Sequence, residues 1–127
     1  MKKQDLPLSP HLQIYKPQIT SLLSISHRIS GVALNFVLVI LVLGLLCITL
    51  GESYFELLIS LINSFPIKII IFLAILGFSY HFLNGIRHII WDFGFLLGNR
   101  SSAIFGYFII ATSIISSIFI SRLLGLF

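Results

Sequence analysis

The segment HFLNGIRHIIWDFG, residues 81–94, places ionisable side chains within and just beyond a run of residues suited to lipid. At about 100° per residue, one face of a helix there carries His81, Gly85, His88 and Asp92. A histidine inside a bilayer costs free energy, so it is usually present for a function. Imidazole binds iron well, and Gly85 leaves room for a flat macrocycle one turn from His81. We therefore predict that His81 is an axial ligand of haem iron.

The composition of the whole chain indicates that its solvent is lipid. Hydrophobic residues make up 57% of the 127 residues and charged residues only 9%, with a mean hydropathy of +1.09. A soluble domain has roughly a quarter of its residues charged, so this chain lacks the side chains to cover a surface in water. The formal net charge of +4 is scattered and forms no basic patch. Membrane lipids are therefore expected partners, and nucleic acid is not.

Three apolar runs are long enough to cross the ~30 Å hydrocarbon layer as helices. We predict an all-α membrane protein with three transmembrane helices over about residues 22–51, 67–91 and 103–124. Ser21 is the expected N-terminal cap of the first helix. The link between the first two helices is predicted to be a loop with a short interfacial helix over residues 57–62 in its middle.

The first residues of the chain are polar and interrupted by Pro7, Pro10 and Pro17. We interpret residues 1–20 as an interfacial arm of a single membrane-anchor domain that spans residues 1–127. The first apolar run is too long for a signal peptide and has no small-residue cleavage site, so we expect a retained span. An Arg- and Ser-rich presequence is also missing. These features favour a multi-pass protein of the bacterial cell inner membrane, or of the mitochondrial inner membrane if the chain is encoded in the organelle.

Basic residues are distributed unevenly between the two predicted sides of the membrane. Those that would share a side with the N-terminus are Lys2, Lys3, Lys16, Arg28, Arg87 and Arg100. Cytoplasmic segments carry an excess of Lys and Arg. The N-terminus is therefore predicted to lie inside, and the C-terminus outside.

Depth in the membrane separates the histidines. His81 lies about ten residues, or about 15 Å, before the inner end of the second span, and His88 lies about 10 Å nearer that end. His27 and Arg28 are expected at the inner end of the first span, level with His88, where all three would face the haem propionates. No second histidine is expected at the depth of His81. The other axial ligand must then come from a partner subunit, and the chain would be half of a heterodimeric helical bundle.

Other polar residues in these segments have structural interpretations. His88 can instead cap a helix end beside Asp92. Asp92 is expected to pair with Arg87 or Arg100, and the alternative is that it helps to relay protons from the inner side. His11 lies in the proline-rich arm, and we assign it no function.

Ser24 and Arg28 are one helical turn apart and so face the same way. An arginine at a membrane interface often extends its side chain to the lipid headgroups. The alternative is a quinone pocket, in which the hydroxyl donates a hydrogen bond to a quinone carbonyl. The guanidinium would then stabilise the negative charge that develops when the quinone is reduced.

Two segments resemble the signatures of one family, the cytochrome b membrane-anchor subunit of succinate dehydrogenase (respiratory complex II). The first combines PLSPHL at residues 7–12 with SISHRISG at residues 24–31, and the second is the segment 81–94 quoted above. With the spans around them, the resemblance covers nearly the whole chain. One departure is Leu6, because the family usually has an arginine just before the first proline.

The resemblance implies roles for individual residues. His81 would bind the iron of a b-type haem shared with a second, different membrane-anchor subunit, which would supply the opposing histidine. Ser24 and Arg28 would belong to the ubiquinone site. His27 and Arg28 would lie close to the haem propionates.

The resemblance also implies an assembly. Succinate would be oxidised in a flavoprotein subunit, and an iron–sulfur subunit would pass the electrons to ubiquinone. This chain has neither the glycine pattern of a flavin site nor a cysteine set for a cluster, so we do not expect it to be catalytic alone. The alternatives are a small transporter or channel subunit, with His81, Asn84 and Arg87 lining a polar pathway, and a membrane anchor without haem.

Overall fold

The computed structural model describes residues 16–127, and this part of the chain is helical apart from short connections. Its helices are α1 (Ile19–Thr49), α2 (Glu52–Asn63), α3 (Phe65–Asp92) and α4 (Asn99–Leu123). Residues 16–127 contain no strand. The prediction of an all-α protein is therefore confirmed for these residues, while most of the predicted arm lies outside them.

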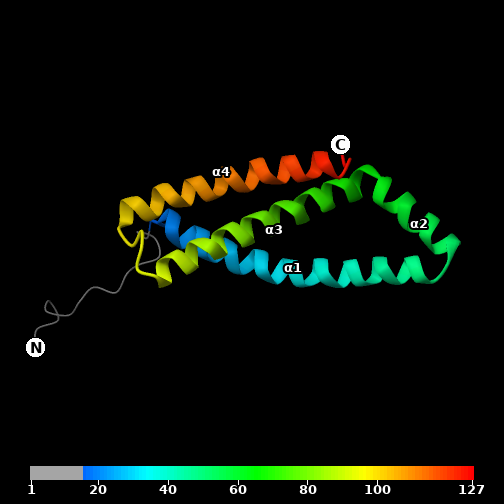
Figure 1. Cartoon of the computed structure of the whole chain (residues 1–127), viewed down its shortest axis with the longest axis horizontal. Helices are drawn as coiled ribbons and strands as arrows, with labels where there is room; N and C mark the ends of the chain where they lie inside the picture. The colour runs from blue at the N-terminus through cyan, green and yellow to red at the C-terminus, as the bar shows by residue number, and fades with distance from the viewer. Residues whose placement is uncertain (1–15) are drawn as a thin grey trace, which may run out of the picture.

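Three of the helices have the length and apolar composition of a membrane span. α1, α3 and α4 contain 31, 28 and 25 residues. At 1.5 Å per residue these lengths are about 46, 42 and 37 Å, more than the ~30 Å hydrocarbon layer. Consecutive spans run in opposite directions, so α1 begins and α4 ends at opposite ends of the bundle (Figure 1).

The first span begins earlier than its predicted bound. α1 starts at Ile19, and its N-cap is Gln18 in extended backbone with no side-chain cap hydrogen bond, so the prediction of Ser21 as the cap is wrong. The backbone N–H of Leu22 donates to the Gln18 carbonyl at 3.1 Å. Pro17 disfavours helical backbone at Lys16, the residue before it, and no glycine or proline between Pro17 and Ser21 prevents a helix from beginning there.

The connection between α1 and α3 is a helix over most of its length. α2 has 12 residues, whereas the sequence predicted a helix only over residues 57–62. Gly51 turns the chain between α1 and α2 with a φ of +113°, a conformation that glycine adopts without steric cost. Pro66 lies in the first turn of α3, where its missing N–H removes no hydrogen bond.

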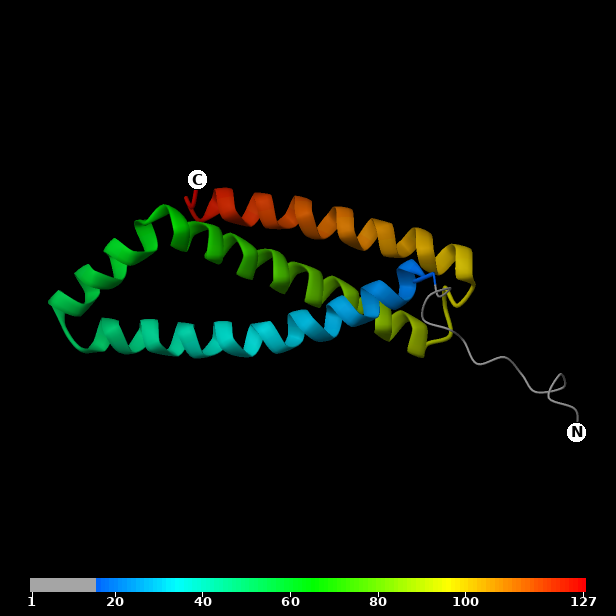
Figure 2. The ribbon, with the colours of Figure 1, turned by 180° about the vertical axis from the view of Figure 1, so that it is seen from behind.

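α3 and α4 lie side by side, as both views show (Figure 1 and Figure 2). The buried residues of α4 recur every three or four positions and are mostly small: Ser102, Gly106, Ile109, Ser113, Ser117 and Ser121. In lipid, small side chains allow two helix backbones to approach closely and gain van der Waals contact. The serine hydroxyls of this face are partly satisfied within α4 itself, as when Ser113 donates to the Ile109 carbonyl at 2.6 Å.

α1 packs against α3 and α4 near its start and contacts only α2 toward its end. It crosses α3 near its start and diverges from α3 toward α2, which bridges the gap (Figure 2). Within the described residues its one buried side chain is Leu23. Most large apolar side chains between residues 32 and 50 are exposed. The polar contacts between α1 and α3 are therefore concentrated at the start of α1.

Candidate functional site

The histidines of α1 and α3 lie between the two helices, each close to a glycine of the opposite helix. A Cβ on Gly31 of α1 would lie 2.8 Å from Cε1 of His81, so the imidazole of His81 occupies the space that a side chain there would need. On α3, a Cβ on Gly85 would lie 3.8 Å from Nε2 of His27, which is an ordinary van der Waals contact. The packing of His81 therefore requires a glycine at residue 31, whereas the packing of His27 does not require one at residue 85.

The two histidines are also held by hydrogen bonds to the backbone. Nε2 of His27 lies 3.1 Å from the His81 carbonyl oxygen. Nδ1 of His81 lies 3.1 Å from the His27 carbonyl oxygen and 3.1 Å from Oγ of Ser30. The Ser30 hydroxyl already donates to the His27 carbonyl at 2.8 Å.

This arrangement assigns the proton on the ring of His81. A carbonyl oxygen only accepts, and the hydroxyl proton of Ser30 is directed at the same carbonyl, so Nδ1 of His81 is the donor. A neutral imidazole then carries a lone pair on Nε2. Nε2 of His81 makes no hydrogen bond to the described residues. Its lone pair is therefore available to a ligand.

The three histidines of the site form a stack. The rings of His27 and His81 are 4.1 Å apart at their centroids and 24° from parallel, and those of His27 and His88 are 5.1 Å apart at the same angle. His88 also contacts the ring of Trp91 edge-on at 5.1 Å. The ring of His27 thus lies between the other two.

The stack changes the depth expected for His27. The sequence placed His27 level with His88 and a full layer away from His81, and that expectation is wrong because His27 contacts both. The earlier start of α1 explains the difference: His27 follows Ile19 by eight positions, or about 12 Å along the helix. A histidine does therefore lie beside His81. Rings stacked on their faces do not direct two nitrogen lone pairs at one iron, so His27 is not the missing ligand.

A complete metal site is not formed by these side chains alone. Within residues 16–127 no group of three or more His, Cys, Asp or Glu side chains is placed to hold a metal ion. Among the three histidines of the stack, His81 has a ring fixed through Nδ1 by two hydrogen bonds and an Nε2 without a partner in the described residues. Any iron bound there needs its remaining ligands from elsewhere.

Ser24 and Arg28 lie on the first turns of α1, on either side of His27 in the sequence. Ser24 is partly exposed and Arg28 is exposed. Neither side chain makes a hydrogen bond to the described residues. Their polar groups can therefore reach a ligand, a lipid headgroup or another subunit.

A polar network that the sequence did not predict lies on another face of α3. Tyr80 and Asn84 both donate to the Leu23 carbonyl of α1, at 2.7 Å and 3.4 Å. Arg87 donates to Asn84 at 3.3 Å and to the Ser102 carbonyl and hydroxyl of α4 at 3.2 Å and 3.1 Å. The spacing of residues 80, 84 and 87 is a helical stripe, and that pattern is present in the sequence.

This network corrects two expectations. Asn84 and Arg87 are both 0% exposed, so they do not line an open pathway of the kind a transporter or channel subunit needs. Arg87 bonds to neutral groups, with its Cζ 4.0 Å from the centre of the Trp91 ring. Its predicted partner Asp92 is exposed, and the expected ion pair does not form in the described part of the chain.

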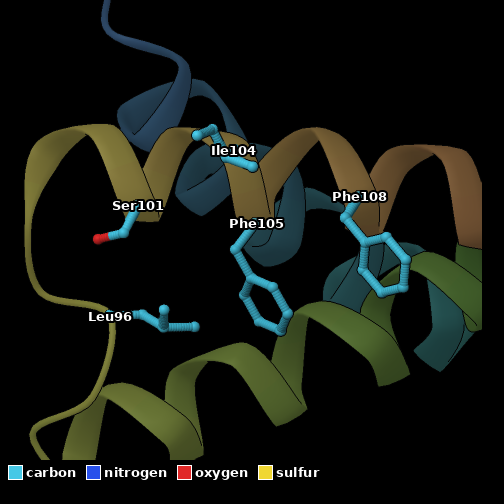
Figure 3. A pocket seen from close by; sticks show the side chains of 5 residues that line it. All are labelled: Leu96, Ser101, Ile104, Phe105 and Phe108. Atoms are coloured by element: carbon cyan, nitrogen blue, oxygen red, sulfur yellow. The ribbon is translucent and has the colours of Figure 1, made fainter.

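An open apolar cavity lies away from these residues. It has a volume of about 480 Å³ and is lined by Leu96, Ser101, Ile104, Phe105 and Phe108. Figure 3 shows the two phenylalanine rings extending from α4 toward α3, to one side of the connection that carries Leu96. The lining is almost entirely apolar, so it offers no chemistry that matches the predicted site.

The three apolar helices and the histidine stack between them define a multi-pass helical membrane protein with a candidate ligand site at one end of the bundle. Residues 2–120 match the family described as succinate dehydrogenase/fumarate reductase transmembrane subunit, and the chain belongs to this family.

Relatives from bacteria and from eukaryotes resemble the chain. It is 44% identical over 109 residues to the succinate dehydrogenase cytochrome b556 subunit of Rickettsia typhi, and the aligned region covers 86% of this chain and 85% of the relative. It is 40% identical over 119 residues to the cytochrome b560 subunit of Chondrus crispus, with 87% and 90% covered. The cytochrome b560 subunit of Marchantia polymorpha is 45% identical over 101 residues, with 75% and 73% covered.

Proposed function

We propose that the chain is the cytochrome b membrane-anchor subunit of succinate dehydrogenase, that it binds a haem b together with a second membrane-anchor subunit, and that it forms part of the ubiquinone-reduction site. The family of the chain and the names of its relatives support this proposal. The observation that carries it is the state of His81, whose Nδ1 is hydrogen-bonded while its Nε2 has no partner in the described residues.

The donor chemistry of the site fits a haem. A histidine that ligates a metal usually donates its other ring N–H to a carbonyl or carboxylate, which fixes the ring and increases the basicity of the ligating nitrogen. The His27 carbonyl and Ser30 Oγ have this role for His81. A haem bound at Nε2 would supply a one-electron redox centre within the membrane.

The opposing axial ligand is a histidine of the second membrane-anchor subunit. His27 is excluded because its Nε2 donates to the His81 carbonyl and its ring is stacked on that of His81. The exposed face of α1 provides surface for such a partner. The two anchor subunits together form the helical bundle, and this chain contributes half of it.

His27, Arg28 and His88 are proposed to surround the haem propionates. His88 stacks on His27 at the end of the cluster nearest the α3–α4 connection. Arg28 is exposed and positively charged, and charge-assisted hydrogen bonds to carboxylates are stronger than neutral ones. These residues hold negative charge at the edge of the site.

Ser24 and Arg28 are proposed to bind ubiquinone. The hydroxyl donates to one carbonyl oxygen of the quinone, and the guanidinium stabilises the charge that forms as the quinone accepts electrons. Both side chains are accessible at the start of α1. Succinate oxidation takes place in the flavoprotein subunit, and the iron–sulfur subunit delivers the electrons to this end of the membrane domain.

The same proposal fixes the topology. Residues 1–127 form one membrane-anchor domain, with the N-terminus inside and the C-terminus outside, in the inner membrane of a bacterium or of a mitochondrion that encodes the chain. The distribution of Lys and Arg between the two sides supports this orientation.

An optical spectrum of the purified complex tests the proposal. Reduction by dithionite should give the Soret and alpha bands of a low-spin b haem. His81→Ala should remove them, whereas the matched control Phe82→Ala, at a neighbouring residue that is 58% exposed, should keep them. A complex that reduces quinone without these bands is a haem-free anchor, and retention of the low-spin spectrum in His81→Ala refutes the assignment of the ligand.

A further inference from the structure

Leu23, near the start of α1, contacts both α3 and α4. The Leu23 carbonyl accepts hydrogen bonds from Tyr80 and Asn84 of α3, at 2.7 Å and 3.4 Å. The Leu23 side chain packs on Gly106 of α4, where a Cβ would overlap Leu23 Cδ1. Leu23 immediately precedes Ser24, the proposed quinone-binding hydroxyl.

Arg87 stabilises this arrangement from within the bundle. It donates through Nη1 to Oδ1 of Asn84, which leaves the Nδ2 group of that amide directed at Leu23. It donates through Nη2 to Ser102, so the same guanidinium also fixes α4. A fully buried arginine is costly in a membrane and is usually retained for a function.

α1 has few other contacts that fix its first turns. Its N-cap makes no side-chain hydrogen bond, and Leu23 is its one buried residue within the described part of the chain. The next contacts along the helix are those of His27 with His81, one turn further on. The carbonyl of Leu23 is therefore the point at which α3 holds the segment that begins with Ser24.

We infer that Tyr80, Asn84 and Arg87 are positioning residues for the quinone-binding end of α1. They do not touch the quinone, but they set the position of the helical turn that presents Ser24 and Arg28. A displacement of about 1 Å in a group that binds the reacting molecule is enough to reduce its effect strongly. The inference rests on the proposed function, because the quinone role of Ser24 and Arg28 is itself part of that proposal.

Tyr80→Phe in the complete purified complex tests the inference, since it removes only the hydroxyl that bonds to Leu23. The matched control is Tyr107→Phe, because Tyr107 is exposed on α4 and its hydroxyl makes no hydrogen bond to the described residues. Tyr80→Phe should raise the KM for a soluble ubiquinone analogue by about three- to tenfold. The rate with succinate and an artificial soluble acceptor should stay at the level of the control.

Hydrogen exchange of the first turns of α1 gives a second measurement that does not depend on quinone. The backbone amides of residues 19–28 should exchange faster in Tyr80→Phe than in Tyr107→Phe. Equal KM values and equal exchange rates in the two variants would overturn the inference. If Tyr80→Phe does not assemble, Arg87→Lys takes its place, and the same comparison with Tyr107→Phe decides.

Arg28→Ala separates the positioning role from the quinone site itself. If Arg28→Ala raises the KM for quinone and Tyr80→Phe does not, the positioning role fails while the proposed quinone site stands. If Arg28→Ala leaves the KM unchanged, the proposed quinone site fails. In that case the exchange rates alone test whether Tyr80 positions α1. Faster exchange in Tyr80→Phe than in Tyr107→Phe supports the positioning role, and equal exchange overturns it.

Discussion

His27 and His81 each place a ring nitrogen 3.1 Å from the carbonyl oxygen of the other residue. The pairing is reciprocal: α1 fixes the imidazole of α3, and α3 fixes the imidazole of α1. It also divides the two residues by role. His27 uses Nε2 in the contact, whereas His81 uses Nδ1 and its Nε2 makes no hydrogen bond to the described residues.

Gly31→Ala should disturb the proposed haem ligand without changing any polar group. A Cβ at residue 31 would lie 2.8 Å from Cε1 of His81, and the ring cannot move away without breaking its hydrogen bonds to α1. Overpacking of this kind costs about 1–3 kcal/mol. The bound haem per complex, read from the reduced spectrum, should fall. Gly77→Ala is the control, because nothing lies within 4 Å of a Cβ there, and equal haem content in both variants would contradict the packing of His81 on α1.

Ser30→Ala should weaken haem binding while leaving the complex assembled. The variant removes one of the two acceptors of the His81 Nδ1–H, and loss of such a partner lowers metal affinity by about tenfold. Transfer of haem to an excess of apomyoglobin measures the change. Ser116→Ala is the matched control. Like Ser30, Ser116 donates to the carbonyl three residues earlier, that of Ser113, at 3.1 Å, but its hydroxyl has no hydrogen bond to a histidine. The prediction is lost if both complexes release haem at the same rate.

Arg28→Ala should separate quinone reduction from succinate oxidation. Without the guanidinium, the charge that develops on the quinone loses its stabilising partner, so the rate of quinone reduction should fall by at least about tenfold. The rate with a soluble artificial acceptor should be unchanged. Arg122→Ala, at an exposed arginine at the other end of the bundle, should change neither rate. A parallel fall of both rates in Arg28→Ala would indicate a defect in assembly instead.

Gly106→Ala should reduce the stability of the membrane domain. The added methyl group would overlap Leu23 Cδ1 and lie 3.7 Å from Nη2 of Arg87, so α1 and α4 would have to separate at their crossing. The expected cost is about 1–3 kcal/mol, measured as a lower temperature at which the detergent-solubilised complex dissociates. In Gly44→Ala the new Cβ would make an ordinary contact of 4.0 Å with Leu58, and this complex should dissociate at the unmodified temperature.

The sequence was sufficient to predict the three spans and the proximity of His27 to His88, because long apolar runs and helical spacing determine both. It did not predict where α1 begins, because neither Gln18 nor Ser21 caps the N-terminus of this helix with its side chain. That error of three residues shifted His27 by almost one turn. The partners of Arg87 were missed for another reason: its hydrogen bonds are to Asn84 and to the backbone and hydroxyl of Ser102, whereas charge alone suggested Asp92.

The mostly small face of α4 is present in the sequence as Ser or Gly at residues 102, 106, 113, 117 and 121, with Ile109 in the same series. The repeat indicates that another helix packs closely there. It does not identify that helix as α3, because such a face suits a neighbour from the same chain and one from a second copy equally well. Gly31 is a similar case, because the need for a glycine there becomes clear only from the position of His81 on the opposite helix.

The one-sided packing of α1 separates two events in the life of the protein. Insertion into the bilayer requires only apolar length, which α1 has before any tertiary contact forms. Assembly with the proposed second polypeptide is a separate step, for which the far half of α1 offers the apolar face that α2 leaves exposed. In a copy that inserts without a partner, this face stays in contact with lipid alone.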